Sequence, residues 1–340
     1  MMILGIETSC DETAAAVVLD GKKILSDVIH SQTVHQQYGG VVPELASRDH
    51  LKKIVPVFRE ALTQAGISPD QIDAVAATSR PGLAGALLVG FCFARGLALS
   101  LNVPFISVNH VEAHAQAAFL NDPELKVPAV ALVVSGGHTS LFYIDPNFRF
   151  FLMGQTLDDA AGEAFDKVAK LLGLGYPGGP AIEQRAKLSS SDKIVFPQAL
   201  LGPQSLDFSF SGLKTSVLNY VLDQKNTRQI LPENLINDIC RGFQTAVCGV
   251  LAEKVKRACD LTDCRNAVVA GGVAANGFLR QNLADVERKE GLKIFIPGIR
   301  LCTDNAAMVA ACGFRMLARG QKITDNTVLS RVIWPKYQNI

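Results

Sequence analysis

One strand-turn-strand pattern occurs twice in this chain, and the two copies are about 130 residues apart. Residues 2–6 and 14–19 are apolar, have the length of strands and flank a polar turn. Residues 128–134 and 140–144 repeat the pattern around a second turn, Ser-Gly-Gly-His-Thr at 135–139. A helix-rich stretch follows each copy. The repeat predicts two related α/β lobes with facing polar turns, an arrangement that can grip a phosphate chain.

The composition agrees with two folded lobes. With 340 residues, 48% of them hydrophobic and 19% charged, the chain can bury two cores, which excludes disorder, collagen and coiled coil. The few charges suit strands covered on both faces. We expect an N-terminal lobe at 1–125, a C-terminal lobe at 126–325 with a helical insertion at about 190–260, and a tail at 326–340. No low-complexity linker separates the lobes, which predicts a hinge.

The spacing of apolar residues, together with residues that start or end helices and strands, predicts the remaining elements. Helices are expected at about 44–66, 84–101, from 109, 160–173, 213–224, 233–258, from 275, and 304–319. Further strands are expected at 72–78, 105–108, 266–270 and 292–296, and a turn at 177–180.

Several features bear on location and redox state. The uncharged stretch 127–144 has a polar turn in its middle, so we interpret it as two buried strands and not a membrane span. The first residues lack a basic region and soon reach acidic residues, which predicts no secretory signal and a cytoplasmic protein. The eight cysteines include no C-x-x-C pair, which favours buried thiols over disulfides or a zinc ribbon.

Charge is uneven along the chain. Residues 1–170 carry 12 Lys and Arg against 18 Asp and Glu, whereas residues 171–340 carry 21 against 14. A basic second half permits a polyanionic partner such as RNA, and it is equally compatible with an ordinary solvated surface.

His110 and His114 are four residues apart, so on a helix both imidazoles lie on one face at a separation suited to a metal. The alternative is a pair of hydrogen-bonded histidines near a helix start. Glu112 lies about 200° around the helix from His110, which makes it a poor general base for a metallopeptidase. Asp304 could supply a third ligand, or it could belong to an ordinary helix cap.

Three glycine-bearing turns, at 135–138, 177–180 and 271–276, adjoin predicted strands or helices. Glycine lets backbone amides approach an oxyanion, and helix N-termini favour negative charge, so together the turns favour nucleotide or phosphate binding. Neither the P-loop nor the Rossmann glycine pattern is present. Asp166 could accept hydrogen bonds from a ribose, or it could simply complement a helix dipole.

Eight motifs run in order along nearly the whole chain. They are G-I-E-T-S-C-D-E-T at 5–13, G-G-V-V-P-E at 39–44, H-V-E-A-H at 110–114, V-S-G-G-H-T at 134–139, P-G-G-P at 177–180, S-F-S-G-L-K at 209–214, G-G-V-A-A-N at 271–276 and C-T-D-N at 302–305. With these motifs the sequence resembles the TsaD family (also called Gcp, YgjD or glycoprotease-like proteins), the tRNA adenosine threonylcarbamoyltransferases.

The resemblance implies a two-lobed actin-like, sugar-kinase-like ATPase (ASKHA) fold with duplicated mixed-sheet domains and a helical insertion. It implies one divalent metal, Fe²⁺ or Zn²⁺, held by His110, His114 and Asp304. Family members often carry Asp at the position of Glu183, which keeps the carboxylate with a longer reach. The residues implied to bind the nucleotide part of the substrate are Val133, Val134, Ser135, Gly136, Gly137, Asp166, Gly179, Glu183 and Asn276.

The implied reaction moves threonylcarbamoyl from threonylcarbamoyl-AMP to the N6 amine of adenosine 37 in tRNAs that read codons beginning with A, and releases AMP. Asp11 or Glu12 would take or position the amine proton. ATP, ADP or AMP with Mg²⁺ could also bind. The implied partners are the tRNA anticodon loop with phosphates near Lys214, a TsaB-like paralogue, a TsaE-like ATPase and a separate synthase for the adenylate.

Three alternatives stay open. An ATPase or phosphotransferase of the same fold does not need the His pair, and a metallopeptidase needs a base that Glu112 is poorly placed to supply. A catalytically silent scaffold resembles the paralogous partner, which lacks the metal pair. The presence of His110, His114 and Asp304 favours the enzyme.

Overall fold

The computed structural model describes residues 1–340 apart from 123, 203, 228–230, 322–326 and 339–340. They form two compact units. Unit 1 comprises Met1–Pro123 and Arg300–Ile333, and unit 2 comprises Glu124–Ile299 and Trp334–Ile340. The division differs from the expected lobes at residues 300–321, because this segment belongs to unit 1, where α10 packs on the N-terminal sheet, and not to the C-terminal lobe.

Unit 1 contains a mixed five-stranded sheet in the order β3-β2-β1-β4-β5. Strands β1 (Met2–Glu7), β2 (Glu12–Leu19) and β3 (Lys23–Ser31) are antiparallel neighbours. Strands β4 (Ala74–Arg80) and β5 (Phe105–Asn109) continue the sheet in parallel with β1. The two parallel connections pass through helices, as crossover connections must.

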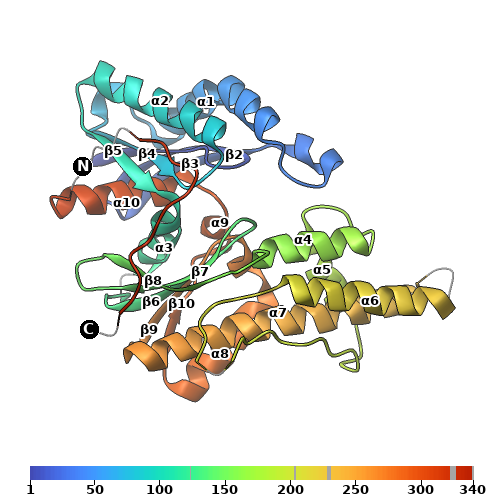
Figure 1. Cartoon of the computed structure of the whole chain (residues 1–340). Helices are drawn as coiled ribbons and strands as arrows, with labels where there is room; N and C mark the ends of the chain where they lie inside the picture. The colour runs from blue at the N-terminus through green and yellow to red at the C-terminus, as the bar shows by residue number, and fades with distance from the viewer. Residues whose placement is uncertain (123, 203, 228–230, 322–326, 339–340) are drawn as a thin grey trace. The chain divides into compact units, whose positions relative to one another are not determined.

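Helices cover both faces of this sheet (Figure 1). Alternation along β1 places Leu4 and Ile6 in the apolar core shared with α1 and α2, while Ile3 lies in the core shared with α3 and α10. The helices of unit 1 are α1 (Pro43–Ala65), α2 (Ala84–Leu101), α3 (His110–Asn121) and α10 (Ala306–Ala318), with short turns η1 (Thr33–Tyr38) and η2 (Pro69–Gln71) and the linking helix α9 (Ile299–Cys302).

Among the described helices, α2 is long and apolar enough to cross a membrane by length and composition. Its Phe91, Ala94 and Ala98 are buried in the core between the sheet and α1, so the apolar composition has a structural explanation within unit 1. A buried core helix can have the same length and apolar composition, so α2 is only weak evidence for a membrane span.

Unit 2 contains a second five-stranded sheet, in the order β10-β9-β6-β7-β8. Its strands are β6 (Ala129–Val134), β7 (Thr139–Ile144), β8 (Phe150–Gln155), β9 (Asn266–Ala270) and β10 (Lys293–Phe295). Strand β6 pairs antiparallel with β7 and parallel with β9, just as β1 pairs with β2 and β4. The two sheets therefore have one topology, and the duplication predicted from the sequence is confirmed.

The helices of unit 2 are α4 (Ala161–Leu171), α5 (Gly178–Lys187), α6 (Ser211–Thr227), α7 (Glu233–Thr262) and α8 (Gly277–Glu290), with a 3₁₀ turn η3 (Gly272–Ala275). The long helix α7 packs against β6, β7, α5 and α8. At the edge of the sheet, Leu152 of β8 pairs with Lys336, so residues after 333 return to unit 2.

Most expected elements are present within a few residues, and three differ. Strands β3 and β8 were not expected from the sequence, and each lies at a sheet edge where residues are partly exposed and the apolar pattern is weak. The expected turn at 177–180 is instead the first turn of α5, because Pro177 is the N-cap and the two glycines and Pro180 enter the helix.

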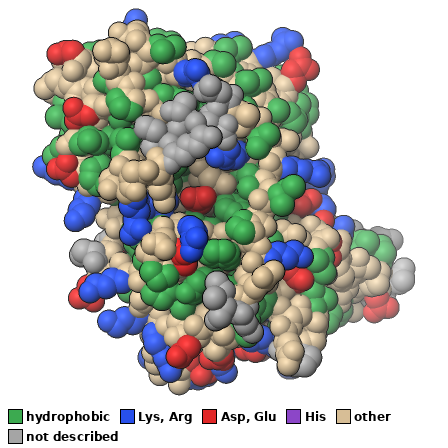
Figure 2. Space-filling view, turned by 60° about the vertical axis from the view of Figure 1, so that its left-hand side comes forward, with side chains coloured by type: hydrophobic (Ala, Val, Ile, Leu, Met, Phe, Trp, Pro, Cys, Tyr) green, Lys and Arg blue, Asp and Glu red, His purple; other side chains and the backbone are tan. Residues whose placement is uncertain are grey.

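On the face drawn in Figure 2, Lys and Arg side chains are interspersed with acidic and apolar ones and do not merge into one basic patch. Several basic side chains of unit 2 are paired with acids, including Lys187 with Glu183 and Lys256 with Glu290. The basic balance of the second half is thus partly compensated by local ion pairs.

Helix α10 packs on strand β1 at Gly5. A Cβ atom at this position would lie 2.1 Å from the carbonyl oxygen of Ala306 and 2.8 Å from the backbone nitrogen of Ala310. No side chain fits in that space, so glycine permits the close approach of helix and strand. The start of α10 is thereby fixed beside the carboxyl end of β1.

We expect Gly5→Ala to lower the free energy of unfolding by about 3 kcal/mol, because a core overpacked against backbone atoms cannot relax cheaply. Gly96→Ala in α2 is the matched control, since no atom lies within 4 Å of its added Cβ. Alanine in a helix should there be neutral or stabilising by about 0.5 kcal/mol. Urea unfolding of both variants measures the difference, and equal stabilities would contradict the account of Gly5.

Candidate functional site

The structure brings His110, His114 and Asp304 together within unit 1. Helix α3 begins at His110 because the side chain of Asn109 caps it, accepting from the backbone N–H of Val111 and Glu112. The two imidazoles are then one turn apart, with ring centroids at 4.5 Å. Asp304 precedes Asn305, whose side chain caps α10 by accepting from the N–H of Met308.

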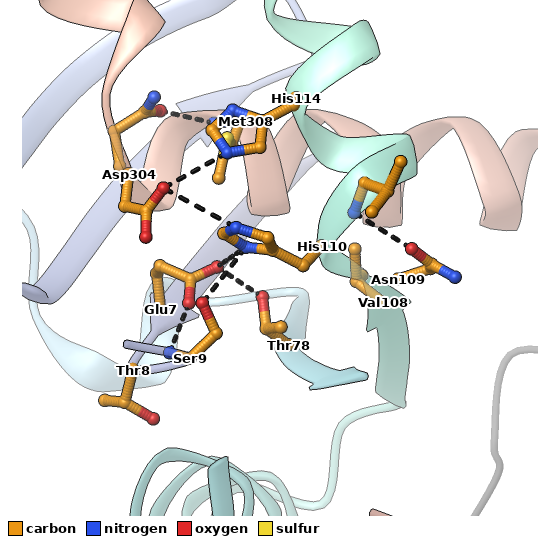
Figure 3. Close-up of polar contacts among 12 residues, drawn as sticks. Glu7, Thr8, Ser9, Thr78, Val108, Asn109, His110, His114, Asp304 and Met308 are labelled. Atoms are coloured by element: carbon orange, nitrogen blue, oxygen red, sulfur yellow. Dashed lines mark hydrogen bonds and ion pairs between the residues drawn. The ribbon is translucent and has the colours of Figure 1, made fainter. Parts of the chain in front are cut away.

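The three side chains converge on one point (Figure 3). Asp304 Oδ1 lies 3.1 Å from His114 Nε2 and 3.5 Å from His110 Nε2. One ligand atom from each residue falls within 4.8 Å of the others. Within the described part of the chain, Nδ1 of the buried His114 has no hydrogen-bond partner, and its Nε2 faces the carboxylate of Asp304. A cation held among these atoms would satisfy the buried nitrogen that faces the carboxylate.

Glu7, at the carboxyl end of β1, contacts Nδ1 of His110, whereas Nε2 of the same ring faces Asp304. Its Oε2 lies 3.1 Å from His110 Nδ1 and accepts from Thr78 Oγ1 at 2.6 Å, while its Oε1 accepts from the N–H of Ser9. Burial tends to raise the pKa of Glu7, but the charge and hydrogen bond of His110 hold it below its usual value. A carboxylate bound to Nδ1 leaves Nε2 pointing toward Asp304, as in carboxylate–histidine–metal arrangements.

His110 and Glu12 have shifted proton affinities. Burial lowers the pKa of His110, but the carboxylates of Asp304 and Glu7 outweigh it and raise the pKa to about 9. Burial together with the negative charge of Asp304 and Asp11 raises the pKa of Glu12 to about 10. Without a cation, Glu12 therefore keeps its proton at neutral pH; a bound cation would favour the carboxylate.

Glu112 takes no part in this group. Its Oε2 lies 3.6 Å from a guanidinium nitrogen of Arg315 in α10, and burial raises its pKa while Arg315 and Arg80 oppose the rise. The predicted orientation of Glu112 away from His110 is thus explained by an ion pair between two helices. The carboxylate is not placed to act as a base for a metallopeptidase.

In unit 2, the turn after β6 leaves its backbone open. A Cβ at Gly136 or Gly137 would meet no atom within 4 Å, and neither residue has φ in the left-handed region. Packing and backbone conformation therefore do not require these glycines, whereas close approach of a ligand would. Ser135 forms the turn by accepting from the N–H of His138 through Oγ, and its carbonyl accepts from Gly162 at the start of α4.

The other predicted nucleotide-binding residues lie in α4, in α5 and just before α8, and hydrogen bonds join these elements. Asp166 Oδ1 accepts from the N–H of Gly178, next to Gly179, whose Cβ position is also open. Glu183 Oε1 lies 3.2 Å from the backbone nitrogen of Gly277, which donates to it and follows Asn276.

The side chain of Asn276 is itself engaged. Its Oδ1 caps α8 at Leu279, and its Nδ2 donates to Gln244. Val133 and Val134 are fully buried in β6, where they pair with β7.

The sequence of this chain matches a known protein family. The model of the family TsaD, tRNA N6-adenosine threonylcarbamoyltransferase, matches residues 23–311. The chain belongs to the TsaD family. It is therefore a transferase, with the activity on tRNA that the family name states.

Curated relatives agree along almost the full length. The chain is 50% identical to the tRNA N6-adenosine threonylcarbamoyltransferase of Desulforapulum autotrophicum, over 97% of this chain and 99% of that protein. It is 52% identical to the enzyme of the same name from Geotalea uraniireducens, over 92% and 90%. The Clostridium perfringens enzyme is 49% identical, over 94% of each chain.

Solved structures with much lower identity share the fold. T. kodakarensis HypF superimposes with a TM-score of 0.62 at 15% identity, covering 93% of this chain and 48% of that one. The activator of 2-hydroxyisocaproyl-CoA dehydratase from Clostridium difficile, solved with bound ADPNP, gives a TM-score of 0.54 at 16% identity, covering 96% and 100%. These matches agree with the predicted actin-like ASKHA fold.

The donor set of this TsaD-family enzyme suits a divalent transition metal. Two imidazoles and one carboxylate are ligands of zinc and of non-haem iron, and three protein ligands leave positions open for a substrate. The metal fits because Nε2 of His110 and Nε2 of His114 both face Oδ1 of Asp304, and Glu7 orients the ring of His110.

Sequence reasoning assigned no role to Glu7, Ser9 or Thr78, which support His110. The signal for Glu7 is its place directly after a buried strand, where a charged side chain at 0% exposure needs a partner. Ser9 and Thr78 carry no such signal, because Ser9 is 101 positions from His110 and Thr78 is 71 positions from Glu7, and no local pattern pairs residues so far apart. His30, His35, His50 and His138 lie outside the metal-ligand group.

We expect metal affinity to fall as the pH is lowered from about 9 to 6. His110 is protonated below its raised pKa of about 9 in the metal-free protein, and a ligand imidazole must be neutral. The apparent Kd for Zn²⁺ should weaken by up to about tenfold per pH unit, with proton release seen by calorimetry in buffers of different ionisation enthalpy. A pH-independent Kd would contradict this.

Glu7→Gln should weaken Zn²⁺ binding at pH 8 by roughly 10–100-fold, since it removes the carboxylate that orients and polarises His110. It should also lower the pKa of His110, because one of the two negative charges that raise this pKa is gone. His30→Ala is the control: His30 pairs with Asp49 outside the group, so its loss should leave Zn²⁺ binding unchanged. Competition with a chromophoric chelator measures the affinities.

Proposed function

We propose that this enzyme transfers the threonylcarbamoyl group from threonylcarbamoyl-AMP to the N6 amine of adenosine 37 in tRNAs that read codons beginning with A, and releases AMP. The observation that carries the proposal is the convergence of His110, His114 and Asp304 in a member of this family. The ATPase or phosphotransferase alternative of the same fold does not need the group formed by His110, His114 and Asp304.

The reaction forms one bond and breaks one. The N6 atom of adenosine bonds to the carbamoyl carbon, the bond from that carbon to the phosphate oxygen breaks, and the N6 atom loses one proton. The exocyclic amine of adenine is a weak nucleophile, so most of the barrier must be lowered on the electrophile and the leaving phosphate.

We assign binding of the adenylate to unit 2. The open backbone at Gly136 and Gly137 supplies N–H groups that can approach phosphate oxygens, and the open turn at Gly179 offers a further backbone site. Asp166 and Asn276 would fix the nucleoside, with Asn276 held rigid by its bonds to Leu279 and Gln244. The same residues would accept ATP, ADP or AMP with Mg²⁺.

In unit 1, the proposed ligands of one Fe²⁺ or Zn²⁺ are His110, His114 and Asp304. Such an ion would supply Lewis-acid polarisation of a carbonyl or phosphoryl oxygen. Glu7 keeps the imidazole of His110 oriented, and Ser9 and Thr78 keep Glu7 in place. We propose Asp11 and Glu12 as the groups that take or position the amine proton, Glu12 once a cation favours its ionised form.

The macromolecular partners are also proposals. The anticodon loop of tRNA would present a splayed adenosine and would contact basic residues of the second half, including Lys214, through its phosphates. A TsaB-like paralogue and a TsaE-like ATPase would assist, and a separate synthase would make the adenylate. We place these events in the cytoplasm, where tRNA is modified.

The test is transfer of labelled threonylcarbamoyl from its adenylate to unmodified tRNA, with the proposed partners present. His114→Ala and Asp304→Ala should reduce transfer by about 100-fold or more and should lose bound metal, because each removes a ligand of the same ion. His30→Ala, the matched histidine variant outside the group, should keep both. If the metal-free variants transfer the group at the wild-type rate, the proposed role of the metal is wrong. If the wild-type protein transfers nothing, the proposed reaction is wrong.

Gly136→Ala and Gly137→Ala should raise the KM for threonylcarbamoyl-AMP by about tenfold, because a methyl group would stand where the phosphate approaches. Their thermal stability should match wild type, since the free protein has open space at both Cβ positions. Gly96→Ala should change neither KM nor transfer rate. Unchanged KM values in both turn variants would remove phosphate binding from this turn.

A further inference from the structure

The acidic turn, residues 9–13, joins β1 to β2 and carries Asp11 and Glu12, the groups proposed to take or position the amine proton. Its start is held from the metal site. The backbone N–H of Ser9 donates to Glu7, and Oγ of Ser9 lies 3.2 Å from Nδ1 of His110 (Figure 3). The part of the turn that bears the two acids is held by a separate group of buried polar side chains.

His50 of α1 contacts the acidic turn at two points. Its Nε2 lies 3.0 Å from the carbonyl oxygen of Cys10, and its Nδ1 lies 2.8 Å from Oγ1 of Thr13. Because a carbonyl oxygen only accepts, Nε2 carries the hydrogen, and Nδ1 of the neutral ring accepts from the hydroxyl of Thr13. Burial lowers the pKa of His50 and outweighs the bond to Cys10 and the nearby carboxylates, which raise it, so the ring is neutral at pH 7.

Gln32, directly after β3, makes a third contact with the acidic turn and also supports His50. Its backbone N–H donates to the carbonyl of Asp11 at 3.1 Å. Its side-chain nitrogen donates to the carbonyl of Ala46 in α1 and lies 3.4 Å from Nδ1 of His50. The carbonyls of Cys10 and Asp11 are therefore both bonded, which fixes the backbone from which the two acidic side chains extend.

His35 connects this group to the G-G-V-V-P-E motif at 39–44, which the proposed function does not use. Its Nδ1 accepts from the backbone N–H of Val42 at 3.3 Å, and its Nε2 donates to Oε1 of Gln32 at 2.8 Å. The amide oxygen of Gln32 thus faces His35, so the amide nitrogen faces α1. Water competes poorly for these bonds, because His35 and His50 are fully buried and Gln32 is 5% exposed.

We infer that His50 is a positioning residue for the proposed reaction: it fixes the backbone of the acidic turn, while Gln32 and His35 hold its ring, so that Asp11 and Glu12 meet the amine proton in one geometry. The inference rests on the proposed role of these two acids. His50 acts through the turn and not on the substrate. A displacement of about 1 Å in a reacting group costs roughly 100-fold in rate, so a loose turn would be expensive.

His50→Ala should lower kcat for threonylcarbamoyl transfer by roughly 10–100-fold, because the turn loses two contacts. The KM for threonylcarbamoyl-AMP and the affinity for Zn²⁺ should not change, since the adenylate is assigned to unit 2 and His50 lies outside the proposed ligand group. His50→Gln should recover most of the kcat, because its amide reaches the position of Nε2 and donates to Cys10. His50→Asn should not, because its shorter amide ends near the position of Nδ1.

Hydrogen exchange measures the hold on the turn without the reaction. The amide of Gln32, bonded to the carbonyl of Asp11, should exchange at least about tenfold faster in His50→Ala and near the wild-type rate in His50→Gln, since such amides exchange through local opening. Ile54→Ala truncates a buried side chain one turn further along α1 and controls for lost stability. It should change neither this exchange rate nor kcat when both are measured well below the Tm.

A wild-type kcat in His50→Ala, or unchanged exchange at Gln32, would overturn the inference. Equal losses in His50→Gln and His50→Ala, or a comparable loss in Ile54→Ala, would overturn it as well, and so would loss of Zn²⁺ from His50→Ala, which would place the effect in the metal site. Where His50→Ala does not fold, the Gln and Asn variants make the same comparison. If the wild-type protein transfers nothing, the proposed reaction is wrong and this role falls with it, whereas an active wild type matched by its variants refutes the role alone.

Discussion

The contact between α10 and β1 is the constraint on which the metal site depends. Strand β1 ends at Glu7, which holds His110, and α10 begins just after Asp304, so the spacing of strand and helix decides whether the carboxylate reaches the imidazoles. Glycine at position 5 allows that spacing, because any Cβ would strike the backbone at Ala306. A packing requirement in the core thus sets a distance of about 3 Å in the site.

The duplication places equivalent turns after β1 and after β6, and the residues at these two turns differ in charge and size. Strand β1 ends with Glu7, directly before its turn, and the carboxylate of Glu7 contacts the buried His110. The corresponding turn after β6 begins with Ser135 and continues with two glycines whose backbone is uncovered. A charged side chain suits a fixed cation ligand set, whereas bare backbone amides suit an anionic substrate that comes and goes. One topology therefore offers both electrostatic environments.

The sequence predicts the interior of this protein better than its edges. Helix α2 was expected at about 84–101 and has these bounds in the structure, where the mostly apolar helix ends at Asn102 in the left-handed conformation. Strands β3 and β8 were not predicted, because an edge strand is only partly buried and its sequence therefore shows a weak apolar pattern. The trio of metal ligands followed from helical spacing and family resemblance. The roles of Glu7 and His50 could not follow, because their partners Thr78 and Cys10 are 71 and 40 residues away and no local pattern encodes them.

The return of residues 300–333 to unit 1 has a consequence for synthesis on the ribosome. Helix α10, which covers one face of the N-terminal sheet together with α3, starts only at residue 306, so during translation that face is at first covered by α3 without α10. At about 5–20 residues per second, the intervening chain takes roughly 10–40 seconds to appear. Most of unit 2 is contiguous and can fold during that interval. The first residues to leave the ribosome are thus among the last to be fully covered.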